Sequence, residues 1–260
     1  MSSTVLLGGS LVIALLAVLI AVLFARRSAS KRGTDILLVG PSDAGKTALL
    51  SALLRPDGRA APSHTSMLPN VAFLPAESSK TRTRAVDIPG HPRLRTQGLQ
   101  DHVGAAKAVV FVVDASTIAR NGAAVAEHLH LTLSTLAALP NTPPVAVVAA
   151  KCDLAGASTT SGVTRVRTVL ERELDKRRAS RVDVEGVGLG METADDGTGN
   201  LGGLETVGAP GTPFRLAEWE GGEIAVLGCS VTISGPTGEK EEASEKDGLI
   251  QVREWIEALE

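Results

Sequence analysis

Short apolar blocks alternate with longer amphipathic stretches along most of the chain. Six blocks have the length of strands: residues 35–40, 71–74, 83–87, 108–114, 145–150 and 223–229. Several lack polar alternation, which is typical of parallel strands covered on both faces. Helical patterns follow at 44–54, 121–138, 162–178 and 247–259. The alternation predicts an α/β fold with a six-stranded, mostly parallel, doubly wound sheet and five helices, in which the two shortest strands form a hairpin near one edge.

A charge-free stretch comes before the first strand. Residues 5–25 carry no charged side chain, and a helix of this length spans a hydrocarbon core of about 30 Å. Residues 26–33 then hold four cations and no acid, so the positive-inside tendency places this basic linker in the cytosol and residues 1–4 across the membrane. A cleaved signal peptide is the alternative, but its cations precede a shorter apolar run. The pattern predicts a single transmembrane helix.

Composition narrows the function of the remaining chain. Hydrophobic residues make up 43% and charged residues 21%, which supports a packed core. Aromatic residues make up only 2%, too few for a protein that stacks bases on rings. Residues 33–260 hold 22 cations against 29 acids, a poor balance for contacting a phosphate backbone. We therefore expect no direct nucleic-acid binding. Cys152 and Cys229 are too few for a disulfide framework, and whether they approach each other is open.

One region does not fit a compact domain at 34–260. Nine glycines fall between Gly186 and Gly211, among acids and few large apolar side chains. Such a segment buries too little surface to offset its loss of entropy on ordering. We expect a disordered insert at about 180–213, which is either a tolerated surface insertion or a partner-binding loop.

The loop after the first strand carries the strongest functional signal. It matches G-x-x-x-x-G-K-[ST], in which two glycines let the backbone N–H groups curl around phosphate oxygens. The N-terminus of the next helix adds a positive field. Lys46 is expected to reach the β and γ phosphates, and the Thr47 hydroxyl to bind Mg²⁺. The predicted phosphate-binding residues are Gly40, Pro41, Ser42, Asp43, Ala44, Gly45, Lys46 and Thr47.

A second phosphate-side motif ends the third strand. Asp87 can hold Mg²⁺ through a water molecule, and the N–H of Gly90 can contact a γ-phosphate. D-x-P-G alone is a turn signature, but its place after a strand and downstream of the phosphate loop favours a nucleotide site.

The fifth strand ends in a candidate base site. The Asp153 carboxylate can accept hydrogen bonds from the N1–H and exocyclic amine of guanine, donors that adenine lacks. Lys151 would lie along the base, and Ser230 and Val231 follow the last strand where a backbone N–H could meet the guanine O6. These residues predict a preference for GTP over ATP.

Taken in order, the phosphate loop, DIPGH, AKCD and the serine-containing last loop resemble the GTPases of the Ras superfamily, closest to the Arf/Sar branch. A single N-terminal span joined to such a domain resembles the β subunits of the signal recognition particle receptor. The stretch DIPGHPRLR…AKAVVFVVDAS…NTPPVAVVAAKCDLA and the final helix with Trp255 carry this resemblance. It covers about residues 1–178 and 223–260 and leaves out the insert.

The resemblance implies a P-loop GTPase domain with GTP and Mg²⁺ as cofactors. It implies that Thr65 is the switch threonine that senses Mg²⁺ and the γ-phosphate, with Ser63 and Ser66 as competitors. His91 stands where many small GTPases have a water-orienting glutamine. A histidine there can orient water or simply pack on the switch segment at 90–98.

Two departures from the pattern bear on activity. Ala150 replaces the asparagine that ties the base loop to the phosphate loop, so we expect weaker nucleotide affinity. No arginine finger is identifiable, because Arg84, Arg93 and Arg95 are expected to be solvated charges. Intrinsic hydrolysis should therefore be slow, about 10⁻⁴ s⁻¹.

The resemblance implies a single-pass protein of the endoplasmic reticulum membrane, with a lumenal N-terminus and a cytosolic GTPase domain. Its GTP-bound state would dock the receptor alpha subunit for co-translational targeting, with the translocon or ribosome as further partners. Two alternatives stay open. The chain could be a constitutive GTP-bound anchor that never cycles, or an Arf-like trafficking GTPase that binds coat or tether proteins.

Overall fold

The computed structural model describes residues 33–75, 83–154, 158–186, 213–219, 221–222, 224–231 and 248–259, with the side chains of the 158–186 segment described up to 178. All of these belong to one compact unit, Gly33–Glu260. The predicted membrane span and most of the glycine-rich insert lie outside the described residues. Within the described part, no helix is both long enough and apolar enough to cross a membrane.

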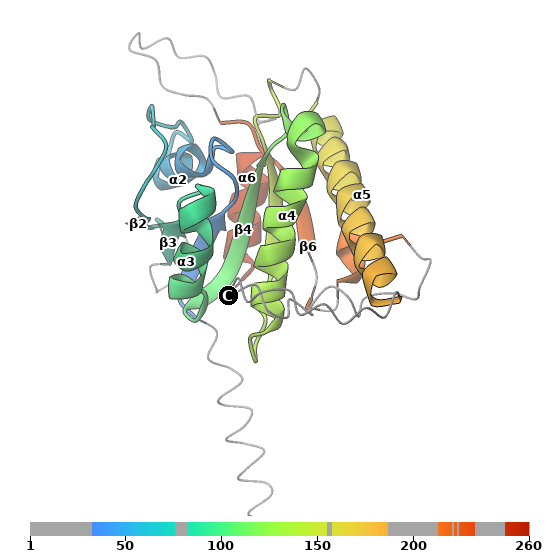
Figure 1. Cartoon of the computed structure of the whole chain (residues 1–260). Coiled ribbons are helices and arrows are strands. Elements are labelled where there is room, and N and C mark those ends of the chain that lie inside the picture. Colours follow the sequence, from blue (N-terminus) through green and yellow to red (C-terminus); the bar gives the residue numbers. More distant parts are fainter. Residues whose placement is uncertain are drawn as a thin grey trace, which may run out of the picture. The chain divides into compact units, whose positions relative to one another are not determined.

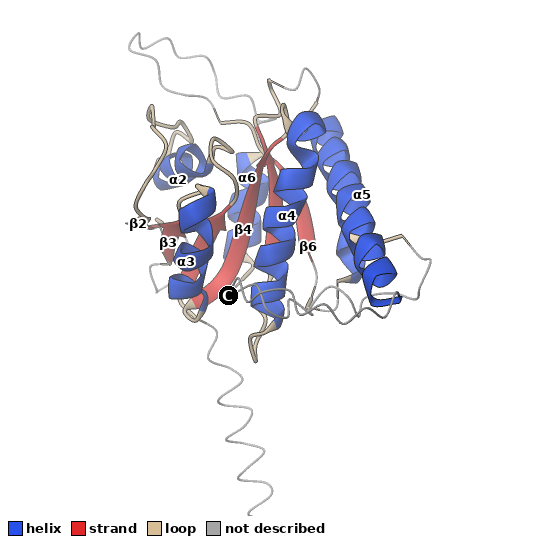
Figure 2. Cartoon of the chain, viewed as in Figure 1, coloured by secondary structure: helices blue, strands red, loops and turns tan. Residues whose placement is uncertain are grey.

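Six strands form one sheet in the described residues (Figures 1 and 2). They are β1 (Asp35–Val39), β2 (Asn70–Phe73), β3 (Arg84–Asp87), β4 (Ala106–Asp114), β5 (Val145–Ala150) and β6 (Ile224–Gly228). The spatial order is β2-β3-β1-β4-β5-β6, with β2 antiparallel to β3 and every other pair parallel. The prediction of a six-stranded, mostly parallel sheet with an edge hairpin pair is confirmed.

Helices cover both faces of this sheet. The described helices are α2 (Lys46–Leu54), α3 (Pro92–Val103), α4 (Ile118–Ala137), α5 (Thr159–Gly186) and α6 (Leu249–Glu257), with a 3₁₀ turn at Leu216–Glu218. Side chains of α3, α4 and α5 share one hydrophobic cluster with the sheet, and those of α2 and α6 share the other. This is the doubly wound arrangement that the sequence predicts.

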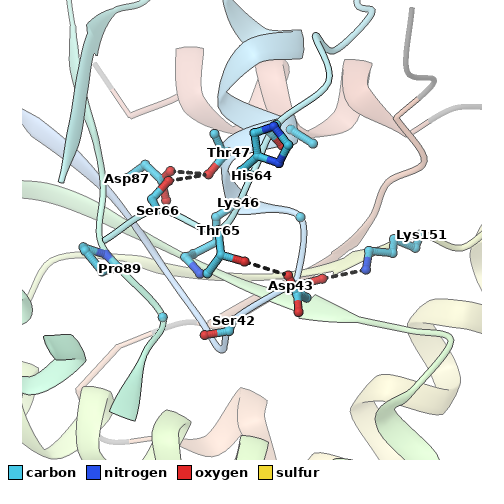
Figure 3. Close-up of a pocket in the computed structure, with 14 residues that line it drawn as sticks. Ser42, Asp43, Lys46, Thr47, His64, Thr65, Ser66, Asp87, Pro89 and Lys151 are labelled. Atoms are coloured by element: carbon cyan, nitrogen blue, oxygen red, sulfur yellow. Dashed lines mark hydrogen bonds between the residues drawn. The ribbon is translucent and has the colours of Figure 1, made fainter. Parts of the chain in front are cut away.

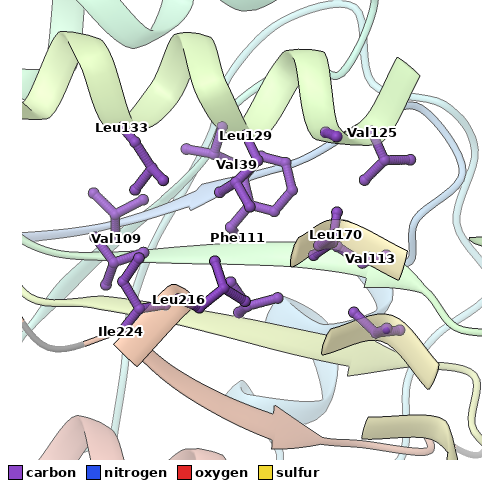
Figure 4. Close-up of a cluster of buried hydrophobic side chains, with 14 of the residues drawn as sticks. Val39, Val109, Phe111, Val113, Val125, Leu129, Leu133, Leu170, Leu216 and Ile224 are labelled. Atoms are coloured by element: carbon purple, nitrogen blue, oxygen red, sulfur yellow. The ribbon is translucent and has the colours of Figure 1, made fainter. Parts of the chain in front are cut away.

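The larger cluster lies between the sheet and helices α4 and α5 (Figure 4). Leu129 and Leu133 project from one face of α4 because they are four residues apart, and they meet Phe111 of β4 and Leu170 of α5. Each is fully buried, which stabilises the fold by about 1.5–3 kcal/mol per side chain. Strand β5 is buried at every position, consistent with its apolar sequence.

The topology gathers the candidate chemistry at one edge. β1, β3, β4, β5 and β6 run in the same direction, so the loops that follow their carboxyl ends lie side by side. These loops contain the phosphate loop, the DIPG turn, Asp114, the AKCD segment and Ser230.

Two helices differ from expectation. The sequence pattern does not give the bounds of helix α3, because Pro92 and Gly98 lower its helix propensity and Leu99 is its one fully buried residue. Pro92 is tolerated at the first turn, and the His91 side chain caps it. Helix α5 continues to Gly186, into the stretch expected to begin the insert, and the run of good helix formers KRRA at 176–179 leads into this extension.

Candidate functional site

The phosphate loop curls between β1 and α2. Gly40 has φ +147, and a Cβ there would lie 2.2 Å from the carbonyl oxygen of Val112, so no other residue fits without moving the sheet. Helix α2 begins at Lys46, which aims its N-terminus into a cleft of about 320 Å³ (Figure 3). The cleft is lined by Ser42, Asp43, Gly45, Lys46, Thr47, Ala48, Ser63, His64, Thr65, Ser66, Asp87, Pro89, Gly90 and Lys151.

The Lys46 ammonium is the buried cation of this cleft. Its Nζ donates hydrogen bonds to the carbonyl oxygens of Gly40 and Pro41, at 3.0 and 2.8 Å. Burial lowers the pKa of Lys46, and the carboxylates of Asp87 and Asp43 partly oppose that shift. A cation held this way, beside a helix N-terminus, makes the cleft a strong site for phosphate groups.

At the start of α2, the hydroxyl oxygens of Thr47 and Ser66 lie close to the carboxylate of Asp87. The Thr47 Oγ1 donates to Asp87 Oδ2 at 2.6 Å and lies 3.3 Å from Ser66 Oγ. Asn70 Nδ2 donates to Ser66 Oγ at 2.8 Å and to Asp87 Oδ2 at 3.2 Å. The other carboxylate oxygen, Asp87 Oδ1, is buried with no hydrogen-bond partner among the described residues. An unpartnered carboxylate oxygen beside two hydroxyls fits hydrated Mg²⁺, whose remaining ligands come from waters and phosphates.

The three candidate switch hydroxyls occupy different places. Ser66 lies beside Thr47 and Asp87, on the metal side. Thr65, which the resemblance assigned to that role, instead donates to Asp43 Oδ1 of the phosphate loop at 3.3 Å. Ser63 lines the cleft without a described contact to Thr47. In this conformation Ser66, and not Thr65, contacts Thr47 and Asn70, and the assignment of Thr65 as the switch threonine stays a prediction.

The DIPG turn rests directly on the phosphate loop. A Cβ on Gly90 would lie 2.5 Å from Pro41 C and Ser42 N, so only glycine allows this approach. The next residue, His91, accepts a hydrogen bond from the Arg93 N–H through Nδ1 at 3.3 Å and so caps α3. His91 does not line the cleft in this conformation. The turn therefore joins the phosphate loop to the first residue of α3.

The base-site loops also meet. The Asp153 backbone N–H donates to Ser230 Oγ at 3.1 Å, which brings the ends of β5 and β6 together. The Asp153 side chain is exposed, and Val231 is half-buried against the core. Lys151 reaches inward and lines the cleft, whereas Asp153, Ser230 and Val231 do not. The four predicted base-site residues therefore lie at and beyond the rim of the phosphate cleft.

The two cysteines approach each other through their backbones. The Cys152 N–H donates to the Cys229 carbonyl oxygen at 3.4 Å. Their side chains belong to different hydrophobic clusters, on opposite faces of the sheet, and neither cysteine forms a disulfide. Burial raises the pKa of the Cys152 thiol, which makes it a poor nucleophile.

Two of the nearby arginines are not simply solvated. The Arg95 side chain is only 15% exposed and lies 3.5 Å from the Glu127 carboxylate. Arg84 lies 3.6 Å from the buried carboxylate of Asp35. Neither is aimed into the cleft lining. The expectation of a solvated charge is therefore wrong for Arg95, which is mostly buried beside Glu127 of α4, whereas the Arg84 side chain stays 40% exposed next to Asp35.

Asp114 and Asn70 were not recognised as site residues from sequence. Asp114 ends the apolar strand AVVFVVD, and an acid at the carboxyl end of a buried parallel strand is a usable signal. Asn70 begins a short, mostly exposed strand and gives no such signal.

Comparisons with known proteins agree with this site. Residues 31–201 match the sequence model of the family described as the signal recognition particle receptor beta subunit. The chain is 34% identical to the human receptor subunit beta over 175 residues, which is 66% of this chain and 63% of the human protein. The Dictyostelium discoideum protein is 31% identical over 186 residues, 72% of this chain and 59% of that protein. The matches thus span less than two thirds of these relatives.

Solved structures give the same fold. The structure of the mammalian signal recognition particle receptor contains a chain that aligns with this one at a TM-score of 0.64 and 24% identity. The alignment covers 87% of this chain and 100% of the receptor chain. The GDP complex of the corresponding subunit from Chaetomium thermophilum has a TM-score of 0.55, with 24% identity and coverage of 87% and 98%. At these identities the likeness establishes a small-GTPase fold.

Proposed function

The chain belongs to the family of signal recognition particle receptor beta subunits, and from this premise we propose that it is a membrane-anchored, GTP-binding subunit whose nucleotide state controls docking of the receptor alpha subunit. The observation that carries the proposal is the contact of the DIPG turn with the phosphate loop at Gly90. A turn held this close responds to a γ-phosphate and passes the change to α3.

GTP with Mg²⁺ is the ligand that these residues fit. The loop from Gly40 to Thr47 would surround the phosphates, with Ser42, Asp43, Gly45 and Thr47 lining the cleft and Lys46 as the cation. Thr47, Ser66 and, through water, Asp87 would hold the metal, which neutralises charge on the β and γ phosphates. Asp153 supplies the guanine preference, supported by Lys151 and by Ser230.

Hydrolysis is expected to be slow and stimulated by a partner. His91 caps α3 instead of lining the cleft, and no described arginine lines it. Without such groups a Ras-type site turns over at about 10⁻⁴ s⁻¹. A switch of this kind is reset slowly, which suits an anchor that stays loaded until its partner arrives.

A surface for the partner adjoins the switch. Met67, Leu68, Val71 and Phe73 are exposed large apolar residues, between 50% and 76% accessible. Val71 and Phe73 alternate with Ala72, which packs on the core, so they share the uncovered face of β2. Since Ser66 on the metal side directly precedes Met67, ordering around Mg²⁺ would position this patch. Contiguous apolar surface beside a switch is typical of a partner site.

The anchor is residues 5–25. Their length and lack of charge fit a single span, and the cations of 26–33 fit a cytosolic flank with residues 1–4 in the lumen. The endoplasmic reticulum follows from family membership. Anchoring raises the local concentration of a soluble partner at that membrane.

The test is a binding measurement with the full chain in lipid nanodiscs, loaded with GDP or a non-hydrolysable GTP analogue. Purified receptor alpha subunit should bind the GTP-analogue form at least about tenfold more tightly. Phe73→Ser should weaken binding of the alpha subunit to the GTP-analogue form at least about tenfold, because it deletes an exposed apolar contact residue. Ile250→Ser, a matched change at an exposed apolar residue of α6, should leave binding intact.

The outcomes separate the alternatives. Equal binding in both nucleotide states would show a constitutive anchor that does not switch. No binding in either state would favour an Arf-like trafficking role, with coat or tether proteins as partners. Failure of the full chain to bind any guanine nucleotide would overturn the proposal at its first step.

A further inference from the structure

Asp114, the last residue of β4, is a hydrogen-bonding hub at the carboxyl edge of the sheet. Its Oδ1 accepts from the Ser116 N–H at 2.8 Å, the Ser116 hydroxyl at 2.6 Å and the Thr117 N–H at 3.3 Å. Its Oδ2 accepts from Lys151 Nζ at 2.8 Å. The side chain is only 12% exposed. The two carboxylate oxygens therefore have separate tasks: one holds the start of α4, and the other holds Lys151.

Lys151 links this hub to the phosphate loop. The same Nζ donates to the backbone carbonyl oxygen of Asp43 at 2.5 Å. Figure 3 shows Lys151 pointing toward Asp43 from the opposite wall of the cleft. Lys151 has φ +56, a left-handed conformation that costs a non-glycine residue on the order of 1 kcal/mol. Backbone hydrogen bonds hold the residues on both sides of Lys151, at Ala150 and Cys152. At the far end of its side chain, Asp114 supplies a charged contact.

The neighbouring residue explains why this contact matters here. Ala150 has no polar side-chain atom, so it cannot tie the base loop to the phosphate loop. In the described residues, the hydrogen bond that joins the segment Ala150–Asp153 to the phosphate loop runs from the Lys151 side chain to Asp43. Burial alone would raise the pKa of the Asp114 carboxyl, but hydrogen bonds from Lys151 and Ser116 outweigh it and hold the pKa below its ordinary value. The carboxylate is thus ionised at neutral pH and pairs with the ammonium.

We propose that Asp114 is a positioning residue of the guanine-nucleotide site, which fixes Lys151 and through it docks the base loop on the phosphate loop. This inference rests on the proposed nucleotide binding. Lys151, held by Asp114, makes the tie to the phosphate loop that Ala150 cannot make. Asp153 is two residues from Lys151, so loss of the tie frees the residue that reads guanine.

The test uses Asp114→Asn in the full chain in detergent micelles. An asparagine oxygen still accepts from Ser116 and Thr117, but the amide nitrogen that replaces Oδ2 cannot accept from Lys151. GDP should dissociate about tenfold faster, and the ratio of GDP to ADP affinity should fall by a similar factor. Ser116→Ala is the matched control: it removes an Oδ1 contact, leaves the lysine pair, and should change GDP dissociation by less than about twofold.

A double-mutant cycle with Lys151→Met isolates the route. If Asp114 acts through Lys151, Asp114→Asn should speed GDP dissociation about tenfold in the native chain. In a chain that already carries Lys151→Met, the same substitution should change GDP dissociation almost not at all. An equal cost in both backgrounds, or unchanged GDP dissociation in the single variant, would overturn the inference while leaving nucleotide binding by the native chain intact. If Asp114→Asn fails to fold, Asp114→Ser replaces it, because a serine hydroxyl can also accept from the N–H two residues on, as Asp114 does from Ser116, and carries no charge.

Discussion

The His128 side chain is a buried titratable group that the nucleotide site does not use. Its ring meets Phe111 edge-on, with centroids 5.3 Å apart and planes at 74°. Its Nδ1 is buried without a hydrogen-bond partner in the described part of the chain. Burial, with smaller contributions from Arg95 and Lys46, lowers the pKa of His128 to about 3. The imidazole is therefore neutral in the folded protein at neutral pH.

Stability should consequently fall in acid. The unfolded chain binds a proton at His128 near the ordinary pKa of 6.5, whereas the folded protein does so only near 3. As pH drops from 6.5 toward 3, this group costs about 1.4 kcal/mol per pH unit. Between pH 7 and 5 the native chain should lose about 2 kcal/mol of unfolding free energy more than His128→Gln does, measured by urea denaturation. An unchanged slope in His128→Gln would contradict this expectation.

The place of the phosphate loop in the fold could be predicted from the sequence, and the arrangement of the switch hydroxyls could not. The phosphate loop is a continuous motif whose spacing is fixed by backbone curvature, so Lys46 and Thr47 line the cleft as expected. The switch segment offers three hydroxyls in four positions, and their spacing does not say which one approaches Thr47. Only the fold of the segment toward Asp87 and Asn70 brings Ser66 there.

At the scale of elements, Glu127 of α4 joins its two neighbouring helices. Its Oε1 lies 3.5 Å from Arg95 of α3, and its Oε2 lies 2.9 Å from Arg177 of α5. Glu127 is half-exposed, so each pair adds at most about 1 kcal/mol. The pair with Arg95 holds α3 in place more than it stabilises the whole fold. Helix α3 follows the DIPG turn and has only Leu99 fully buried, so it has few other attachments.

Glu127→Gln should loosen α3 while barely changing overall stability. We expect amide hydrogen exchange in 94–103 to become about three- to tenfold faster, with a change in unfolding free energy below about 1 kcal/mol. Glu173→Gln is the matched control, because its described partners, Arg172 and Lys176, lie on its own helix. Equal exchange in α3 for the native chain and Glu127→Gln would show that helix packing alone holds α3.

The strands could be predicted to within two residues at each end, and helices less well. β4 and β5 are buried on both faces, so their composition alone reports their environment. Helix α3 carries charged and polar side chains at most positions, and its attachment depends on the sheet that it covers. Helix α5 continues past Leu174, the last fully buried residue among its side chains described up to 178, because local helix propensity continues there.

For the whole molecule, anchoring and nucleotide binding should be separable. Gly33–Glu260 is one compact unit, so deletion of residues 1–25 removes the proposed span without removing a described core residue. The full chain should stay with membranes in alkaline carbonate, while 26–260 should be found in the supernatant and bind GDP within about twofold of the full chain. Release of the full chain by carbonate would contradict the single span, and loss of GDP binding in 26–260 would show that the two parts depend on each other.

The open edge of strand β2 makes the isolated chain prone to aggregate. It is the last strand of the sheet on its side, so one row of its backbone N–H and C=O groups has no neighbouring strand in the described fold. Val71 and Phe73 add apolar side chains to that open edge, with no lysine or proline within the strand to discourage a second copy from pairing there. A chain made in excess of the proposed partner would thus expose a template for edge-to-edge aggregation. We therefore expect the unpartnered chain to aggregate more as its concentration rises.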